Sequence, residues 1–191
     1  MADNDMKIYS RGMDINASAS IAAAFETMNM HRANGNLQKA RELGSRLATI
    51  TPSFDSDGFV VSFEGILPQK FLSQDILYQI KVLLVFAAES SLQIKVPTEH
   101  LSTTAINSLY NSLEKNSPGF FKNISDGAAF TFYYLALQKG GDITKNIGET
   151  FAMLCSVHKS NEGFVSAGET VWKLAIEIIE KEINSVNFAD V

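Results

Sequence analysis

Apolar residues recur every three or four positions along most of the chain, which is the spacing of one face of an α-helix. The clearest stripe consists of Trp172, Ile176, Ile179, Ile183 and Val186. A helix expected over 69–92 differs, because its middle is apolar on all sides and such a helix belongs at the centre of a domain. The pattern predicts a mainly α protein, with about seven helices in a single bundle-like or repeat-like domain.

The predicted helices are separated by residues that typically end or begin a helix. Gly35 and the pair Gly140–Gly141 favour left-handed helix ends. Asn36 and Asp142 follow them, and we expect each side chain to cap the next helix. The two breaks therefore predict two helical hairpins of similar design.

Two further boundaries are predicted from proline, glycine and capping residues. Pro118–Gly119 is expected to form a loop between helices. Ser166 and Glu169 have the spacing of a capping box, which predicts that the last helix begins at Ser166.

Some segments depart from the helical pattern. Residues 1–15 are polar and lack a period, so we expect a flexible N-terminal arm before a single helical domain over 16–191. Residues 59–63 and 92–96 have strand-like composition, and a small two-stranded β patch between them is compatible with the pattern.

Charge and apolar run length narrow the class of protein. The formal net charge is -5, and the 16 Lys and Arg residues form no cluster, so we predict no nucleic-acid binding. The longest apolar run, Val82–Ala88, is far shorter than the roughly 20 residues that a membrane-spanning helix needs. With no signal peptide in the sequence, we expect a cytoplasmic protein that does not associate with membranes.

The stretch His31–Pro52, "HRANGNLQKARELGSRLATITP", resembles part of a tetratricopeptide repeat. A unit over 21–54 would have the 34 residues of such a repeat. Gly35 falls at its turn, Ala40 at the small residue of its second helix, and Pro52 at its closing proline. The residues after Phe54 do not continue an array. The resemblance implies one helical hairpin whose faces can form a groove for another protein or peptide.

The acidic segment 53–64 has a partial resemblance to a calcium-binding loop. Asp55, Asp57 and Glu64 fall at ligand positions, and Gly58 falls at the bend. However, Ser53 replaces the leading carboxylate, and the flanking prolines interrupt both helices that such a loop requires. The favoured interpretation is a turn that leads into a strand, with no metal bound.

One Cys-His pair is a candidate for chemistry. Cys155 and His158 share a helix face, as a nucleophile with its base or half of a zinc site would. Cys155 is the only cysteine, and apolar neighbours favour a core residue. The sequence contains no nucleophile elbow, phosphate-binding glycine loop or zinc-binding helix motif, so we predict no catalytic residue and no cofactor.

Four aromatic residues are candidates for a ligand pocket. They are Phe130, Tyr133, Tyr134 and Trp172. Aromatic residues at helical spacing more often form core than a pocket, and both interpretations remain open.

We therefore expect a cytoplasmic helical module that binds a protein or peptide. The alternative is a helical sensor that encloses a small apolar ligand, and a third interpretation is an enzyme with an unrecognised site. A homo-oligomer is also compatible with the wide apolar face of the last helix, although burial within one chain explains that face equally well. The residues that widen it are Val171, Leu174, Ala175 and Ile178.

Overall fold

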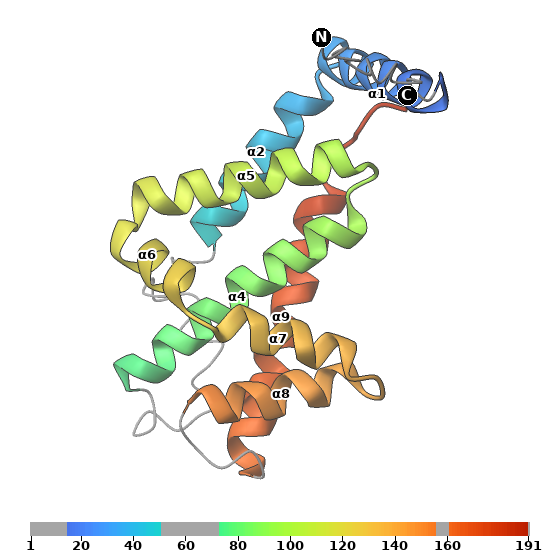
Figure 1. Cartoon of the computed structure of the whole chain (residues 1–191). Helices are drawn as coiled ribbons and strands as arrows, with labels where there is room; N and C mark the ends of the chain where they lie inside the picture. The colour runs from blue at the N-terminus through green and yellow to red at the C-terminus, as the bar shows by residue number, and fades with distance from the viewer. Residues whose placement is uncertain (1–14, 51–72, 156–160, 191) are drawn as a thin grey trace, which may run out of the picture.

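A computed structural model describes residues 15–50, 73–155 and 161–190. These residues form eight helices and no strand, which confirms the mainly α prediction (Figure 1). The helices are α1 (Ile15–Ala33), α2 (Asn36–Ile50), α4 (Gln74–Lys95), α5 (Glu99–Asn116), α6 (Pro118–Asp126), α7 (Ala129–Gln138), α8 (Ile143–Leu154) and α9 (Glu162–Asn184). The predicted N-terminal arm, the strand at 59–63 and the acidic loop lie outside the described residues.

Helix α4 lies at the centre of the domain, as its composition predicts. Every residue from Val82 to Ala88 is buried, because α5, α7, α8 and α9 all contact this helix. Figure 1 shows α4 and α9 crossing the middle of the molecule, with α2 and α5 on one side and α7 and α8 on the other. Burial on every side explains why α4 lacks a polar face.

Helices α2 and α5 pack with their backbones in close approach. Their facing stripes are fully buried, with Ala40 and Leu43 on α2 against Ala105 and Leu109 on α5. A Cβ atom on Gly44 would lie 2.0 Å from the carbonyl oxygen of Ala105. Only glycine therefore permits this approach at position 44.

Glycines also permit close packing of α8 against α9. A Cβ atom on Gly168 would lie 2.6 Å from the Cβ of Phe151, and one on Gly148 would lie 2.6 Å from the carbonyl oxygen of Val165. Helix α7 completes this half of the molecule, and a Gly140–Gly141 turn joins it to α8. Both glycines have a φ of 76°, which confirms the predicted left-handed helix end.

Helix α1 projects from the body of the molecule (Figure 1). The side chains of Ile21, Phe25 and Met30 are exposed on it. The segment after α9 runs back toward the turn between α1 and α2, so residues from both ends of the described chain meet there.

Two of the predicted helix boundaries are wrong. Pro118 begins α6 instead of forming a loop, because proline fits the first position of a helix, where no amide hydrogen is needed. Helix α9 begins four residues before the predicted capping box. Its cap is Asn161, whose side chain accepts a hydrogen bond from the Phe164 amide. Ser166 lies inside that helix, where the predicted cap has no role.

The predicted strand at 92–96 is also wrong. Residues up to Lys95 continue α4, because Leu92 falls on the buried face of the helix and its carbonyl accepts the amide of Val96. Val96 itself is extended, as the residue before Pro97 should be. The alternation of apolar and polar residues in this segment reflects the last turn of a helix.

Candidate functional site

The four aromatic residues predicted to line a pocket lie around the ring of Phe86. The distances from its centroid are 5.6 Å to Phe130, 5.1 Å to Tyr133, 5.0 Å to Tyr134 and 6.0 Å to Trp172. The structure therefore brings these residues together, and it places Phe86, which the sequence analysis did not single out, at their centre.

These rings are packed on one another and contribute to the core. Tyr133 is fully buried and its ring stacks on Phe86, while Trp172 is almost fully buried. Among the described residues the Tyr133 hydroxyl has no hydrogen-bond partner, and burial raises the pKa of this group well above its ordinary value. The aromatic cluster thus joins α4, α7 and α9, and the apolar ring faces carry most of its stabilisation.

The candidate residues for metal or thiol chemistry do not form a site among the residues described. Cys155 ends α8, and burial raises the pKa of its thiol to about 12, so the thiol is protonated at neutral pH. His158, Asp55, Asp57 and Glu64 lie outside the described residues. Within the described ranges, no group of three or more His, Cys, Asp and Glu side chains could hold a metal ion.

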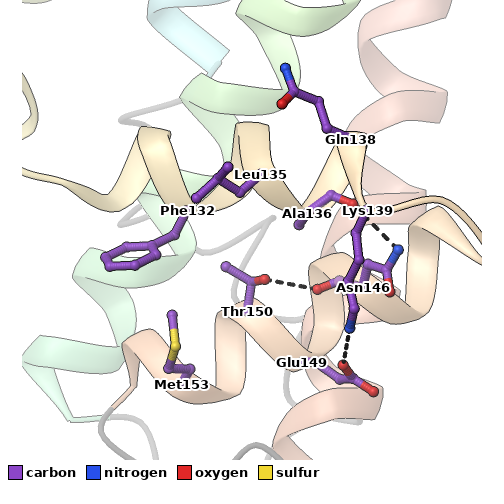
Figure 2. A pocket seen from close by; sticks show the side chains of 9 residues that line it. All are labelled: Phe132, Leu135, Ala136, Gln138, Lys139, Asn146, Glu149, Thr150 and Met153. Carbon is purple, nitrogen blue, oxygen red and sulfur yellow. Dashed lines mark hydrogen bonds and ion pairs between the residues drawn. The ribbon is translucent and has the colours of Figure 1, made fainter.

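An open cavity lies between α7 and α8, and Figure 2 shows its lining side chains. Its volume is about 470 Å³. The lining residues are Phe132, Leu135, Ala136, Gln138, Lys139, Asn146, Glu149, Thr150 and Met153. We call this cavity and its rim the α7–α8 groove.

One side of the α7–α8 groove is apolar and exposed. Phe132 and Leu135 extend from α7, and Met153 lies opposite on α8 (Figure 2). These side chains are 41%, 56% and 42% exposed. Large apolar side chains gathered at a concave surface are typical of a protein-binding site, and a methionine adapts readily to partners of different shape.

The other end of the groove is polar and ordered. The Lys139 ammonium lies 3.3 Å from a Glu149 carboxylate oxygen, and both groups are partly exposed. The Asn146 side chain donates to the carbonyls of Ala136 and Gly140, which fixes the turn between the two helices. The groove thus has apolar walls toward one end and an ion pair at the other.

A second feature of interest is the contact between Asn36 and the segment after α9. The Asn36 side chain donates to the Ala189 carbonyl and accepts from the Ala189 amide, both at 2.8 Å. Its amide nitrogen also lies 3.0 Å from Nδ1 of the buried His31, which accepts that bond. Asn36 is fully buried, and its side chain bonds both main-chain groups of Ala189, as the backbone of a neighbouring β-strand would.

The prediction that Asn36 caps α2 is therefore wrong. Asn34 supplies the side-chain acceptor instead, and it lies 3.2 Å from the Asn36 amide. Two asparagines, Asn34 and Asn36 on either side of Gly35, satisfy the sequence pattern for a cap, and Asn36 is instead bonded to the distant Ala189. No local signal could have identified the contact.

Replacing Asn36 with alanine is expected to release the segment around Ala189. Loss of these buried hydrogen bonds should lower the free energy of unfolding by about 1–2 kcal/mol. Hydrogen exchange resolved by residue should show a faster rate at Ala189 while the amides of α4 remain protected. The control is Gln38→Ala, because that side chain is exposed and, among the described residues, bonds to Glu42 on the same helix and not to the segment after α9. Unchanged exchange at Ala189 would contradict the assignment.

No helix in the described ranges combines the length and the apolar character needed to cross a membrane. Comparison of the chain with models of protein families, with curated proteins and with solved structures finds no match.

Proposed function

We propose that this protein binds an amphipathic helical segment of a partner protein in the α7–α8 groove. The observation that carries the proposal is the exposure of Phe132, Leu135 and Met153 on opposite walls of one cavity. Binding would remove these side chains from water, at about 25 cal/mol for each Å² of apolar surface buried.

The shape and polarity of the groove favour a helix as the bound segment. The ridge of side chains on a third helix fits between two packed helices. An amphipathic helix would place its apolar stripe over Leu135 and Met153 and leave its polar flank near the Lys139–Glu149 pair. Charges of both signs at that rim can pair with charged residues on the partner and so fix its direction.

One further feature supports an interaction module, and another concerns its location in the cell. The α1–α2 hairpin, with its turn at Gly35 and buried Ala40, is compatible with the proposed tetratricopeptide-like unit. The proposal includes a cytoplasmic location, for which the low cysteine content, Cys155 alone, is the supporting feature.

The test is selection of helical peptides on the full chain. A displayed library of amphipathic helices is expected to yield peptides that bind in the groove. Leu135→Asp should weaken their affinity by about tenfold or more, because it places a charge on the apolar wall. The matched control is Ile94→Asp, since Ile94 is 74% exposed on α4 and does not line the groove.

The outcomes separate the proposal from its alternatives. If the peptides bind Leu135→Asp with the same affinity as Ile94→Asp, the interaction lies elsewhere, which would contradict the proposed site. Sedimentation of the protein alone tests a second copy as the occupant, because Ile21 and Phe25 on α1 are exposed and lie one helical turn apart. A dimer that both Leu135→Asp and Phe25→Asp dissociate would identify α1 of another copy as the bound helix.

A further inference from the structure

Glu89 lies in a second cavity, separate from the α7–α8 groove. It is half-buried on α4, in a helix turn whose other residues belong to the core. One carboxylate oxygen accepts a hydrogen bond of 2.7 Å from the Tyr134 hydroxyl, and the other accepts one from the Tyr110 hydroxyl. Tyrosines from two other helices, α5 and α7, therefore hold this carboxylate in one orientation.

The two tyrosines orient Glu89 but do not neutralise its negative charge. Burial, and then the hydrogen bond to Glu89, raise the pKa of both Tyr110 and Tyr134 above the ordinary value, so both remain neutral donors. No Lys, Arg or His in the described part of the chain forms an ion pair with Glu89. Each carboxylate oxygen receives one of these hydrogen bonds and keeps a further lone pair for another donor.

The cavity beside Glu89 has a volume of about 480 Å³, which is within the range of small-molecule sites. Glu89 and Tyr110 line it together with apolar side chains, among them Phe121, Ile124 and Phe130. The Tyr110 and Phe121 rings meet edge to face, with centroids 6.2 Å apart. A single carboxylate on α4 is thus surrounded by aromatic and aliphatic walls from α5, α6 and α7.

The Glu89 carboxylate and the apolar walls together determine which charge and which apolar groups a ligand should have. An ammonium group is attracted both by a carboxylate and by the faces of aromatic rings. An anionic ligand would be repelled by Glu89, while a neutral apolar ligand would cover the carboxylate without supplying a partner, which is unfavourable. The walls favour a ligand whose remaining atoms are apolar.

We propose that this cavity binds a small protonated amine with an apolar or aromatic body. Its ammonium group donates to the free lone pairs of Glu89, and its body packs on Phe121, Ile124 and Phe130. This inference goes beyond the proposed function, because the cavity and the α7–α8 groove share no lining residue. Either site can therefore be lost without the other.

The test compares ligands that share a phenylethyl body and differ in charge, on the full chain. Titrations followed by two-dimensional NMR use 2-phenylethylammonium, the anionic 3-phenylpropionate and the neutral 2-phenylethanol. The ammonium compound is expected to shift amide resonances around Glu89 and to bind about tenfold or more tightly than the other two. Equal affinity for the three compounds, or no binding of the ammonium compound, would overturn the proposal.

A substitution at Glu89 tests whether the ligand binds in this cavity. Glu89→Gln keeps the size of the side chain and removes its charge, so the affinity for 2-phenylethylammonium should fall by about tenfold or more. The control is Glu180→Gln, which removes an equal charge from the surface of α9, where Glu180 pairs with Lys95. Unchanged affinity in Glu89→Gln would overturn the assignment.

A second variant keeps the test decisive if Glu89→Gln does not fold. Ser125 is exposed on α6 and lines the cavity, so Ser125→Phe fills it from the solvent side without altering the core. Binding of 2-phenylethylammonium should be lost in this variant, whereas persistent binding would place the ligand elsewhere and overturn the proposal.

Discussion

Replacing Phe86 with alanine is expected to lower the free energy of unfolding by about 4 kcal/mol, as for other large-to-small changes at buried phenylalanines. Phe86 is fully buried, and its ring contacts four other aromatic rings. Those rings come from α7 and α9, which cannot both move inward to fill the space left by the ring. A cavity should therefore remain at the point where three helices meet.

Denaturant unfolding followed by tryptophan fluorescence measures this loss, because Trp172 is the only tryptophan and lies beside Phe86. The matched control is Phe132→Ala. Phe132 is an exposed phenylalanine on α7, so its removal should change the stability far less. Equal losses in the two variants would show that the aromatic cluster is not the centre of the core.

Replacing Gly44 with alanine is expected to destabilise the protein by about 3 kcal/mol, in the upper part of the range for overpacking. The added Cβ would lie 2.0 Å from the Ala105 carbonyl oxygen and 2.9 Å from the Leu109 amide nitrogen. Both contacts are to the backbone of α5, so no side-chain rotation can relieve them. Helices α2 and α5 must separate, although alanine is the better helix former by about 1 kcal/mol.

Thermal and denaturant unfolding test this prediction, with Gly119→Ala as the control. A Cβ on Gly119, in the first turn of α6, would meet nothing within 4 Å. The stability of that variant should be unchanged or higher by up to about 1 kcal/mol. If Gly44→Ala were also as stable as the unaltered protein or more stable, α2 and α5 could not pack as closely as the structure shows.

The sequence predicts the helices best where a buried stripe and a capping residue agree. Asp142 caps α8 as expected, and its side chain accepts a hydrogen bond from the Lys145 amide. Both signals are local, since helical spacing and a cap involve residues within a few positions. The prediction fails at Ser166, because a capping pattern also occurs inside a helix and Asn161 supplies the cap earlier in the chain.

The candidate sites depend on contacts between distant residues, which local patterns do not encode. The aromatic residues were predicted as a group, but Phe86 lies in α4 and could be placed among them only by the fold. The α7–α8 groove was missed because Leu135 and Met153 are residue types that usually lie in the core. Their exposure depends on how the helices pack, which the local sequence does not show. Glu89 was missed for the same reason, since its two tyrosines come from other helices.

The contact between Asn36 and Ala189 joins residues that are 153 positions apart in the chain. During synthesis on the ribosome, α1 and α2 emerge early, whereas the partner of Asn36 emerges only after every other described helix. The buried side-chain amide of Asn36, at the start of α2, therefore lacks this partner until Ala189 has been synthesised. The α1–α2 hairpin is thus synthesised before the residue that completes its hydrogen bonds, so a chain cut short before Ala189 would lose a buried contact 153 positions away.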